Sequence, residues 1–458
     1  MLQLRHKQVL VVGLARSGVA AANLLLSQGA LVRVTDHRKP GDSFRDELEN
    51  KLQGEVETTL GCHRVADFLQ ADLIILSPGV PADIDPLRKA QSAGVPVLAE
   101  VELAFHFLSG PIIAVTGTNG KTTTTTLIGQ MFLDAQEAVA VAGNIGTPLT
   151  EIALLGPDQG TTSVVELSSF QLEGIQDFRA HIALILNVTP DHLDRHGSLE
   201  SYALAKRRIL LNQTRKDWAV LNADDELSSG MRSEAAGSVC LFSRRPLPEG
   251  VCVKEGQIVI RQKGETISVM PASEILMKGE HNLENVLAAT CAAYLSGLSV
   301  RAVRHTIQNF KGVEHRLERV GVHDGVTYYN DSKATNVESA KRALLAFSNP
   351  VVLIMGGQDK GGDFEQLAEL IEERVRRLIL IGEAAGKIGR AVGSSAAVSE
   401  AADLPEAVVQ ASRAASWGDT VLLAPGCASF DMFDDYEHRG REFKESVARL
   451  IHHRESGN

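Results

Sequence analysis

Cysteine is scarce and scattered in this chain of 458 residues. The cysteines are odd in number, and none has the spacing of a CxxC or Cys/His metal site. Buried cysteine usually packs as a small apolar side chain. We therefore expect reduced thiols, and neither a disulfide framework nor a cysteine-bound metal; the five are Cys62, Cys240, Cys252, Cys291 and Cys427.

Two further absences limit the cellular compartments and the binding partners that the sequence allows. No apolar run approaches membrane-spanning length, and the first apolar stretch, residues 9–12, is too short for the core of a signal peptide. Positive charge is not in excess, because the formal net charge is -11 at pH 7, which argues against broad attraction to nucleic acid or anionic lipid. We expect a cytoplasmic protein with no membrane insertion and no nucleic-acid partner.

The chain is longer than one hydrophobic core usually organises, and its composition, 44% hydrophobic and 22% charged, is that of a folded protein. Three stretches open with a β-branched strand, a glycine and a helix-like segment, which is typical of parallel α/β units. We predict an α/β fold of three domains: Rossmann-like at 1–98, P-loop ATPase-like at 99–312 and Rossmann-like at 313–458. The predicted strands include residues 9–12, 31–35, 73–76, 95–98, 112–115, 163–165, 181–186, 326–329, 351–355, 378–381 and 420–423.

Residues 116–122 (TGTNGKT) lie between an apolar strand and a helix. Glycines let backbone N–H groups face a phosphate, Lys121 can reach the outer phosphates, and the Thr122 hydroxyl can bind Mg²⁺. The common phosphate-loop pattern would need glycine at position 115, where this chain has Val115, although Gly117 supplies a nearby alternative. An ordinary strand-to-helix turn is disfavoured because lysine and threonine follow the glycine directly.

Two other strands end on residues that can serve a metal site. Glu166 follows the strand at 163–165 and can hold Mg²⁺ through a carboxylate oxygen, although such a carboxylate taken alone more often begins a helix. His192 lies among acidic residues after the strand at 181–186, where a lone histidine is more often structural. Their order after the phosphate loop favours a site that binds nucleotide and metal.

The N-terminal segment carries a second nucleotide motif. Residues 13–18 (GLARSG), with Asp36 after the next strand, are similar to the dinucleotide fingerprint, with Ala15 in place of its middle glycine. The pattern favours a nucleotide-diphosphate site over simple close packing of strand and helix, and it need not mean NAD. Gly79 follows another strand, on the edge where the same ligand would lie.

Three motifs lie in the C-terminal third. In residues 330–336 (NDSKATN), Asp331 can accept hydrogen bonds from a ribose while lysine and threonine offer donors to an anion; the alternative is an ordinary helix cap. Residues 424–431 (APGCASFD) form a strand-to-loop edge that is either a site or a cap. Residues 382–389 (GEAAGKIG) lack Ser or Thr after the lysine, and we predict no phosphate site there.

These motifs, with residues 279–285 (GEHNLEN) and 315–318 (HRLE), resemble the bacterial Mur ligases over nearly the whole chain. Residues 331–336 together with 315–318 favour the family member that adds D-glutamate. The resemblance implies a ligase that uses ATP and Mg²⁺ to join D-glutamate to UDP-N-acetylmuramoyl-L-alanine through an acyl phosphate. It also implies closure of the third domain on the second, and we expect a monomer.

The resemblance further implies roles for individual residues. ATP would contact Gly117, Thr118, Asn119, Gly120, Lys121, Thr122, Thr123, Asn282, Asn285, Arg316 and Asp331. The ligands of Mg²⁺ would be Thr122, Glu166, His192 and Lys206, the lysine as a CO₂-derived carbamate because an ammonium cannot ligate a cation. The catalytic roles would fall to Lys121, His192, Lys206 and Arg316.

Substrate contacts are implied in the same way. The UDP-sugar would contact Arg16, Ser17, Asp36, His37, Arg38, Gly79 and Asn144, and Ser168 and Lys333 would also bind substrate. D-glutamate would contact Thr335, Lys360, Ser429 and Tyr436. The chain departs from the family pattern at His37, where a small hydroxyl residue is usual, and at Tyr436, where phenylalanine is common.

Three other functions fit parts of the sequence. A sister ligase would add another amino acid, or would add glutamate to a folate. An NAD-dependent dehydrogenase would use the N-terminal motif, and a non-catalytic module would bind nucleotide only. Lys121, Glu166 and His192 together count against the last two.

Overall fold

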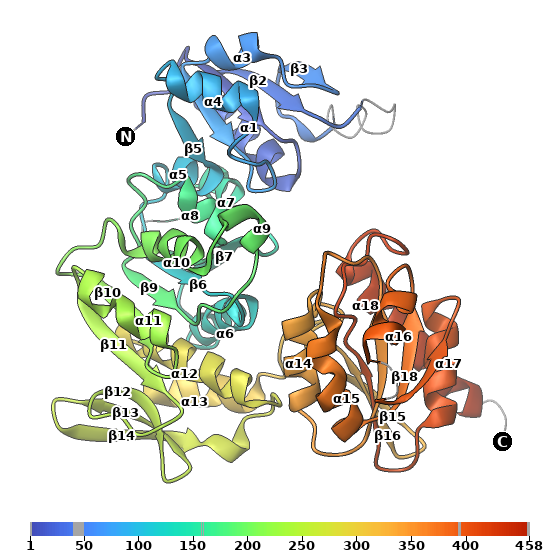
Figure 1. The fold of residues 1–458 in the computed structure, drawn as a ribbon. Coiled ribbons are helices and arrows are strands. Elements are labelled where there is room, and N and C mark those ends of the chain that lie inside the picture. The colour runs from blue at the N-terminus through green and yellow to red at the C-terminus, as the bar shows by residue number, and fades with distance from the viewer. Residues whose placement is uncertain (1, 40–49, 157, 159, 393–394, 456–458) are drawn as a thin grey trace. The chain divides into compact units, whose positions relative to one another are not determined.

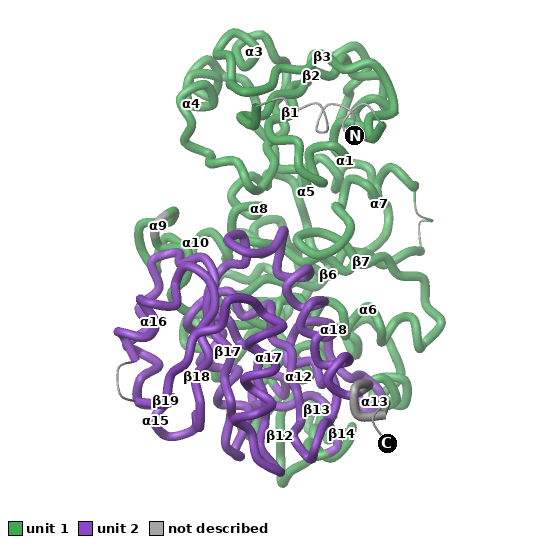
Figure 2. The backbone as a smooth tube through the Cα atoms, turned by 90° about the vertical axis from the view of Figure 1, so that its right-hand side faces the viewer, with its two compact units in different colours: residues 1–273, 284–306 green, residues 274–283, 307–458 purple. Residues whose placement is uncertain are grey.

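The computed structural model describes residues 2–39, 50–156, 158, 160–392 and 395–455 (Figure 1). These residues form three sheets. The chain separates into two compact units (Figure 2): unit 1 comprises residues 1–273 and 284–306, and unit 2 comprises residues 274–283 and 307–458. The first two sheets belong to unit 1 and the third belongs to unit 2. The predicted α/β class is confirmed, while the domain boundaries near residues 98 and 312 stay predictions.

The first sheet and its helices comprise β1 (Gln8–Val12), α1 (Arg16–Ser27), β2 (Leu31–Asp36), β3 (Glu57–Leu60), α3 (Val65–Leu69), β4 (Leu73–Leu76), α4 (Asp85–Ser92) and β5 (Val97–Ala99). The strands are parallel in the order β3-β2-β1-β4-β5. Leu10 and Val12 of β1 pack with α3 and α4, whereas Val9 and Val11 pack with α1 on the other face. Because helices cover both faces, the domain has the predicted Rossmann-like arrangement.

The second sheet comprises β6 (Ile112–Thr116), β7 (Val139–Gly143), β8 (Thr162–Glu166), β9 (Ile182–Ile185), β10 (Trp218–Asn222), β11 (Ser238–Ser243), β12 (Gly250–Lys254), β13 (Gln257–Gln262) and β14 (Glu265–Pro271). The strand order is β14-β13-β12-β11-β10-β9-β6-β8-β7, and only β12 to β14 pair in antiparallel fashion. Since β6 lies between β8 and β9, the residues that follow these three parallel strands meet at one edge of the sheet.

The helices around this sheet are α5 (Glu100–Phe105), α6 (Lys121–Asp134), α7 (Leu149–Leu155), α8 (Ser169–Glu173), α9 (Leu193–His196), α10 (Leu199–Arg207), α11 (Glu226–Gly230), α12 (Glu280–Leu295) and α13 (Val300–Asn309). The boundary between the units falls within α12, after Leu283. One hydrophobic core runs from α1 and the first sheet into α5, α7 and the second sheet. The two sheets of unit 1 are therefore packed against each other through these helices.

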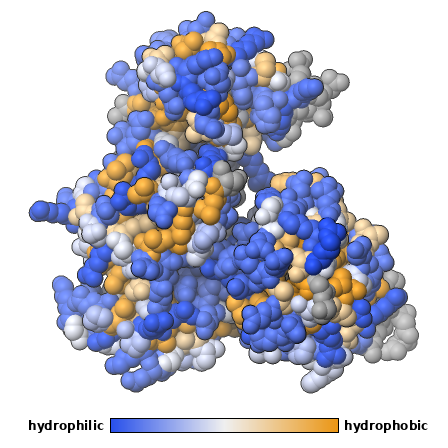
Figure 3. Space-filling view, viewed as in Figure 1, coloured by the Kyte–Doolittle hydropathy of each residue, from blue (hydrophilic) through white to orange (hydrophobic). Residues whose placement is uncertain are grey.

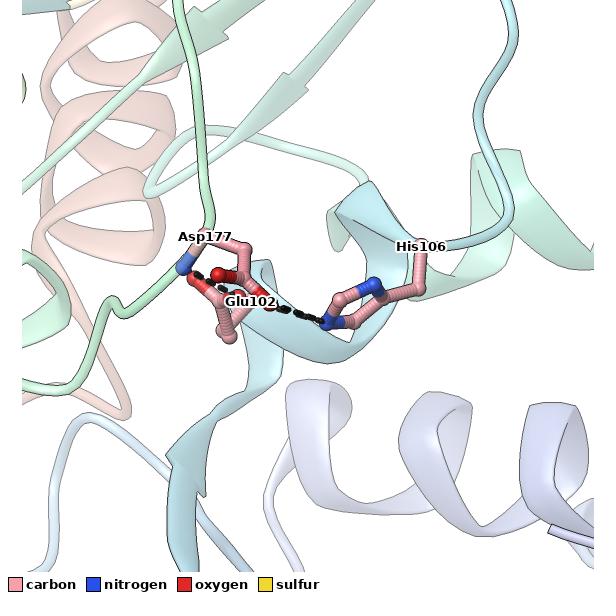
Figure 4. A group of neighbouring side chains, drawn as sticks. All are labelled: Glu102, His106 and Asp177. Atoms are coloured by element: carbon pink, nitrogen blue, oxygen red, sulfur yellow. Dashed lines mark hydrogen bonds and ion pairs between the residues drawn. The ribbon is translucent and has the colours of Figure 1, made fainter. Parts of the chain in front are cut away.

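Glu102 fastens α5, the helix that follows the first sheet, to the segment after α8 (Figure 4). Its fully buried carboxylate accepts the N–H groups of Gln176, Asp177 and Phe178 at 2.8 to 2.9 Å, and His106 Nε2 lies 3.3 Å away. Three backbone N–H donors thus engage both carboxylate oxygens of Glu102. These contacts give the cluster of Glu102, His106 and Asp177 a structural role.

The third sheet and its helices comprise β15 (Glu318–His323), β16 (Val326–Asn330), α14 (Val337–Leu345), β17 (Val351–Gly356), α15 (Ala368–Arg374), β18 (Val375–Ile381), α16 (Ala385–Val392), β19 (Ala397–Glu400), α17 (Leu404–Ala414), β20 (Thr420–Leu423) and α18 (Tyr436–Glu455). The order is β15-β16-β20-β17-β18-β19, parallel except for β15. Leu353 and Met355 pack with α14 to α16, and Val352 and Ile354 pack with α17 and α18. This sheet is also covered on both faces, and the carboxyl ends of β16, β20, β17 and β18 share one edge.

Two absences expected from the sequence can be compared with the structure. All five cysteines are free thiols, as predicted. Among the described residues, no helix combines the length and the apolar character that a membrane crossing requires. The face of the molecule seen in Figure 3 is largely hydrophilic, with small apolar patches between the polar residues.

Candidate active site

The phosphate loop, residues 116–122, connects the end of β6 to the start of α6. Gly120 has a φ of 83°, and a Cβ built on it would lie 2.2 Å from Asn285 Oδ1, so conformation and space both require glycine. Asn187, which follows β9, supports the loop: its Oδ1 accepts the Asn119 N–H at 2.9 Å and its Nδ2 donates to Asn119 O at 3.2 Å. The loop thus presents the N-terminus of a 14-residue helix, a favourable place for a phosphate.

The two predicted catalytic lysines of unit 1 meet at one carbonyl of this loop. Lys121 Nζ donates to the carbonyls of Gly117 and Thr118, both at 2.8 Å. Lys206 Nζ, which comes from α10, donates to the same Gly117 carbonyl at 2.8 Å. Residues 85 positions apart in the sequence are therefore brought within reach of one atom of the phosphate loop.

Lys206 is buried to an unusual degree for a lysine. Its side chain is 1% exposed, and Nζ lies 4.3 Å from the centre of the Tyr202 ring. Burial lowers the pKa of Lys206 well below its ordinary value; the charge of Lys121 lowers it further, while Asp191 and Glu166 oppose the shift. The uncharged amine, which is the form that reacts with CO₂, is thereby favoured.

Glu166, at the end of β8, has the features of an oxygen ligand for a metal. It is 2% exposed, and its Oε1 accepts a hydrogen bond from Asn144 Nδ2 at 3.0 Å. Its Oε2 is buried and accepts no hydrogen bond from the described residues. A buried carboxylate oxygen without a donor is costly unless a cation satisfies it. The buried Thr122 hydroxyl, in the first turn of α6, belongs to the same sheet edge because β6 and β8 are neighbours.

His192 precedes α9 in a left-handed conformation, with a φ of 52°. Its side chain is half exposed, its ring centre lies 5.0 Å from that of Phe170, and Nε2 lies 3.8 Å from Asp191 Oδ2. The segment belongs to the same edge, because Asn187 and Thr189, a few residues earlier, contact the phosphate loop. Phe170 and Asp191 therefore orient a histidine that remains open to solvent.

The residues predicted for adenosine divide between the two units. Asn285 belongs to unit 1, where its Oδ1 accepts from Thr124 Oγ1 at 3.4 Å. Asn282 belongs to unit 2, where its Nδ2 donates to Lys278 O at 2.6 Å. Both lie on α12, so this helix carries one predicted adenine contact in each unit.

Arg316 and Asp331 are joined through a tight turn of unit 2. Asp331 Oδ1 accepts the N–H of Leu317 at 3.1 Å, and the φ values of His315 and Leu317 are 63° and 41°, which is strained for residues other than glycine. Burial raises the pKa of Asp331 to about 6 against the opposing effects of Arg316, Leu317 and Lys333. Arg316 Nε is buried and donates to no described residue. A bound nucleotide can form hydrogen bonds with both the Asp331 carboxyl group and Arg316 Nε.

The N-terminal motif is organised by Asp36, at the end of β2. Its carboxylate accepts the Leu14 N–H at 2.8 Å and three donors of Arg38 at 2.8 to 3.0 Å. Burial alone would raise the pKa of Asp36, but these donors hold it at about 2. Ser77 Oγ, after β4, donates to Gly13 O at 2.9 Å and ties the two neighbouring strand ends together. The carboxylate is therefore fully engaged in shaping this edge of the sheet.

A cavity of about 940 Å³ adjoins this edge, beside α1 and the segment that leads into α7. It is lined by Arg16, Asn23, Arg38, Lys51, Gln53 and Glu151, among others. Arg16 and Gly79 are exposed, Ser17 is half-buried, and the His37 side chain is 80% exposed. The cavity and the exposed groups suit a polar, charged ligand of nucleotide size.

The residues predicted for D-glutamate lie on segments that follow neighbouring strands of unit 2. The Gly426 N–H donates to Ala334 O at 2.8 Å, which joins the segment after β20 to the segment after β16. Lys333 Nζ lies 5.2 Å from the centre of the Tyr436 ring. Ser429 is buried, whereas Lys360 is exposed. The residues predicted for D-glutamate thus come from one edge of the third sheet, together with the predicted substrate residue Lys333; they are Thr335, Lys360, Ser429 and Tyr436.

Two predicted substrate residues have structural partners of their own. Asn144 donates to the candidate metal ligand Glu166, as described above. Ser168 caps α8: its Oγ accepts the Gln171 N–H at 3.2 Å and donates to Gln171 Oε1 at 3.1 Å. Sequence reasoning did not single out Asn187 as a support of the phosphate loop, although its place at a strand end was an available signal.

Comparison with known proteins shows the family to which the chain belongs. Family profiles match residues 7–99 (Mur ligase MurD-like, N-terminal domain), 115–293 (Mur ligase middle domain) and 315–427 (Mur ligase, glutamate ligase domain). The chain belongs to the Mur ligase family and is an ATP-dependent ligase. Membership counts against the dehydrogenase and the non-catalytic module.

Relatives of one name match nearly end to end. The UDP-N-acetylmuramoylalanine--D-glutamate ligase of Koribacter versatilis is 47% identical over 98% of this chain and 99% of its own length. The ligase of the same name from Acidobacterium capsulatum is 46% identical over 97% of each chain.

Solved structures support the fold at lower identity. A UDP-N-acetylmuramate-alanine ligase, MurC, from Thermotoga maritima is 20% identical with a TM-score of 0.60, covering 97% of this chain and 100% of that one. A pseudomurein peptide ligase type C from Methanothermus fervidus is 18% identical with a TM-score of 0.60, at the same coverage.

Proposed function

We propose that this ligase joins D-glutamate to UDP-N-acetylmuramoyl-L-alanine with ATP, in peptidoglycan precursor synthesis. The observation that carries the reaction type is the meeting of Lys121 and Lys206 at the Gly117 carbonyl of the phosphate loop. The choice of acid and amine follows the printed name of relatives that match the chain over nearly its whole length.

The first step of the proposed reaction forms an acyl phosphate. The carboxylate of the UDP-linked substrate attacks the γ-phosphorus of ATP, the bond to the bridging oxygen breaks, and ADP leaves. Two anions must approach each other, so positive groups fixed before the reaction lower its barrier most effectively. We assign this role to Lys121 and Arg316, and we assign the ribose and adenine to Asp331, Asn282 and Asn285.

The residues at the edge of the second sheet fit a divalent cation. Glu166 Oε2, which accepts no hydrogen bond from the described residues, and the Thr122 hydroxyl are hard oxygen ligands. His192 is half exposed and follows β9, at the same edge of the second sheet. When bound, Mg²⁺ would neutralise charge on the phosphates. Lys206 can join this set only as a carbamate, and its burial supports that assignment.

The second step forms the peptide bond. The amine of D-glutamate attacks the acyl carbonyl, phosphate leaves, and the amine loses a proton. Thr335, Lys360, Ser429 and Tyr436 are assigned to the amino acid, whose two carboxylates need donors on more than one side, and Lys333 is assigned to substrate binding beside them. The UDP moiety is assigned to the edge formed by Arg16, Ser17, Asp36, His37, Arg38 and Gly79. We further propose a cytoplasmic monomer.

An assay of ADP release tests the proposal. With ATP, Mg²⁺ and UDP-N-acetylmuramoyl-L-alanine, we expect ADP to form with D-glutamate and not with L-glutamate or without an amine. Mass spectrometry should show the glutamyl product. Faster ADP release with another amino acid, or with glutamate and a folate as acceptor, would identify the enzyme as a sister ligase.

A further inference from the structure

A fully buried arginine lies among the segments assigned to D-glutamate. Arg439, on α18, is 0% exposed. Its Nε donates to Ser332 Oγ at 2.9 Å, and its Nη2 donates to Ser332 O at 2.8 Å and to Cys427 O at 3.3 Å. Its Nη1 donates to Cys427 O at 3.3 Å and to Ala428 O at 3.2 Å. These five bonds use all five N–H groups of the guanidinium.

The acceptors of Arg439 are all neutral, which makes their positions critical. Burial lowers the pKa of Arg439 to about 10, with Cys427 and Asp431 opposing, so the group stays charged at pH 7. A buried charge is tolerated only when its hydrogen bonds are satisfied. If any acceptor moved away, an N–H of a cation would be left without a partner, so the guanidinium resists displacement of each acceptor.

The acceptors belong to two of the segments that carry predicted D-glutamate contacts. Ser332 directly precedes Lys333, and the carbonyls of Cys427 and Ala428 directly precede Ser429. Ser332 Oγ also donates to the carbonyl of Tyr436 at 2.8 Å, one helical turn before Arg439. A single side chain therefore connects the segment after β16, the segment after β20 and the start of α18.

A further segment is held through Ala428. Gln358 and Ala428 exchange two backbone hydrogen bonds, each 3.0 Å long, and Lys360 follows two residues after Gln358. The approach is close enough that a Cβ on Gly357 would lie 2.2 Å from Ala428 O and 3.2 Å from Arg439 Nη1. The position of Lys360 is thus linked to the same buried group.

We propose that Arg439 is the positioning residue of the D-glutamate site: it fixes the spacing between the Ser332 and Ser429 segments without contacting the amino acid. This inference rests on the proposed function. Arginine suits the task because its planar fork reaches acceptors on two segments at once, whereas lysine carries its three donors on a single atom. The spacing of these segments determines whether donors reach both carboxylates of the substrate, so the Michaelis constant for D-glutamate depends on Arg439.

The test is Arg439→Lys in the full-length enzyme, assayed by ADP release with each substrate varied in turn. The variant keeps the charge and loses the fork. We expect KM for D-glutamate to rise about tenfold or more, with KM for ATP and for the UDP-linked substrate within about twofold of wild type. The matched control is Arg449→Lys on the same helix, whose side chain is 61% exposed and which should leave all three constants unchanged.

Several results would overturn the proposal. An unchanged KM for D-glutamate in folded Arg439→Lys enzyme would do so, and so would equal rises in all three constants with a lowered melting temperature. If Arg439→Lys does not fold, Ser332→Ala keeps the guanidinium and removes one hydroxyl, which accepts from Arg439 Nε and donates to the Tyr436 carbonyl. We expect a rise of about threefold in the same constant, and no rise would refute the idea. Wild-type enzyme that is inactive with D-glutamate would instead refute the proposed function, and this inference with it.

Discussion

Four ionisable side chains that we assign to the site or to its support are almost fully buried: Glu166, Lys206, Asp331 and Arg439. Burial disfavours the charged forms of Lys206, Asp331 and Arg439, and their neighbours decide how far the pKa of each moves. Arg439 keeps its charge through five hydrogen bonds, whereas Asp331 has a single described backbone donor and a raised pKa. A buried ionisable group with few hydrogen-bond partners, such as Asp331, marks a place where a bound ligand would stabilise the folded protein.

Asp331→Asn should stabilise the free enzyme above pH 6. The folded-state pKa of Asp331 is raised from 3.8 to about 6, so the folded protein binds more protons than the unfolded chain between these values. The contribution of this group is fully present below about pH 4 and is lost as the pH rises through 6, at a cost of roughly 3 kcal/mol. Asparagine removes the charge and can still accept the Leu317 N–H.

Urea unfolding at pH 8 and at pH 4.5 measures the effect of Asp331→Asn. We expect the variant to be more stable than wild type at pH 8, with the difference shrinking at pH 4.5. Glu445→Gln, an exposed carboxyl in the same unit, should change stability by less than about 0.5 kcal/mol at either pH. A variant that is equally destabilised at both pH values would contradict the raised pKa.

Lys121→Ala should reduce turnover by roughly 10²- to 10³-fold at saturating substrate, because a preorganised positive charge on the transferring phosphate is removed. The measurement is ADP release. Lys254→Ala, an exposed lysine of β12, is the control and should keep normal turnover. Near-normal turnover of the Lys121 variant would remove Lys121 from the proposed mechanism.

Lys206 should carry a carbamate in the active enzyme. Enzyme equilibrated with ¹³C-labelled bicarbonate should show a carbamate carbonyl signal by NMR, and Lys206→Gln should lack it. Depletion of CO₂ should lower activity, and bicarbonate should restore it. A Lys206→Gln variant that keeps the carbamate signal, or wild-type activity that does not depend on CO₂, would contradict the assignment of a carbamate to Lys206.

At the scale of elements, the phosphate loop depends on space as well as on conformation. Gly120→Ala combines an unfavourable φ of 83° with a Cβ 2.2 Å from Asn285 Oδ1. Gly156 ends α7 with a φ of 62°, and a Cβ there would meet nothing within 4 Å. We expect Gly120→Ala to lower kcat/KM for ATP by about 10²-fold, because the displaced loop misplaces the phosphates.

Gly156→Ala serves as the control for Gly120→Ala. It bears a similar backbone cost, about 1 kcal/mol, without the clash. It should therefore lower the melting temperature slightly and leave kcat/KM for ATP within about twofold. Equal losses of kcat/KM in both variants would show that contact with Asn285 does not matter.

The parallel strands could be predicted from the sequence because each is a short, continuously apolar run that ends at a glycine or a polar residue. The predicted strand at 95–98 begins only at Val97, since Pro96 lacks the N–H that a ladder needs. The antiparallel hairpins of β12 to β14 were not predicted. They form the end of the second sheet, and the apolar runs of β12 and β13, residues 251–253 and 258–260, are only three residues long and are flanked by polar or glycine residues.

The candidate site was predictable where its residues share a local motif, as in residues 116–122. It was not predictable where partners are distant in sequence. Arg439 and Ser332 lie 107 residues apart, and Asn187 and Asn119 lie 68 apart, so only the sheet order brings them together. Arg439 in particular looks, in sequence, like any charged residue of an amphipathic helix.

At the scale of the whole molecule, the assigned contacts divide between two units with separate cores. The described core clusters around the first two sheets lie in unit 1, and those around the third sheet lie in unit 2. Each unit can therefore unfold cooperatively by itself, and we expect two calorimetric transitions. A ligand stabilises only the unit whose folded state it contacts.

The transition that each substrate shifts should therefore report its assigned residues. D-glutamate should raise only the unit 2 transition, since its assigned contacts run from Thr335 to Tyr436, and the UDP-linked substrate should raise only that of unit 1. ATP should raise both, because Lys121 belongs to unit 1 whereas Asn282 and Asp331 belong to unit 2. At a hundredfold excess over Kd, each ligand adds about 2.7 kcal/mol to the unit it binds. If ATP shifted only the unit 1 transition in calorimetry, its contacts would lie in unit 1 alone. That result would contradict the assignment of Asn282 and Asp331 to the nucleotide.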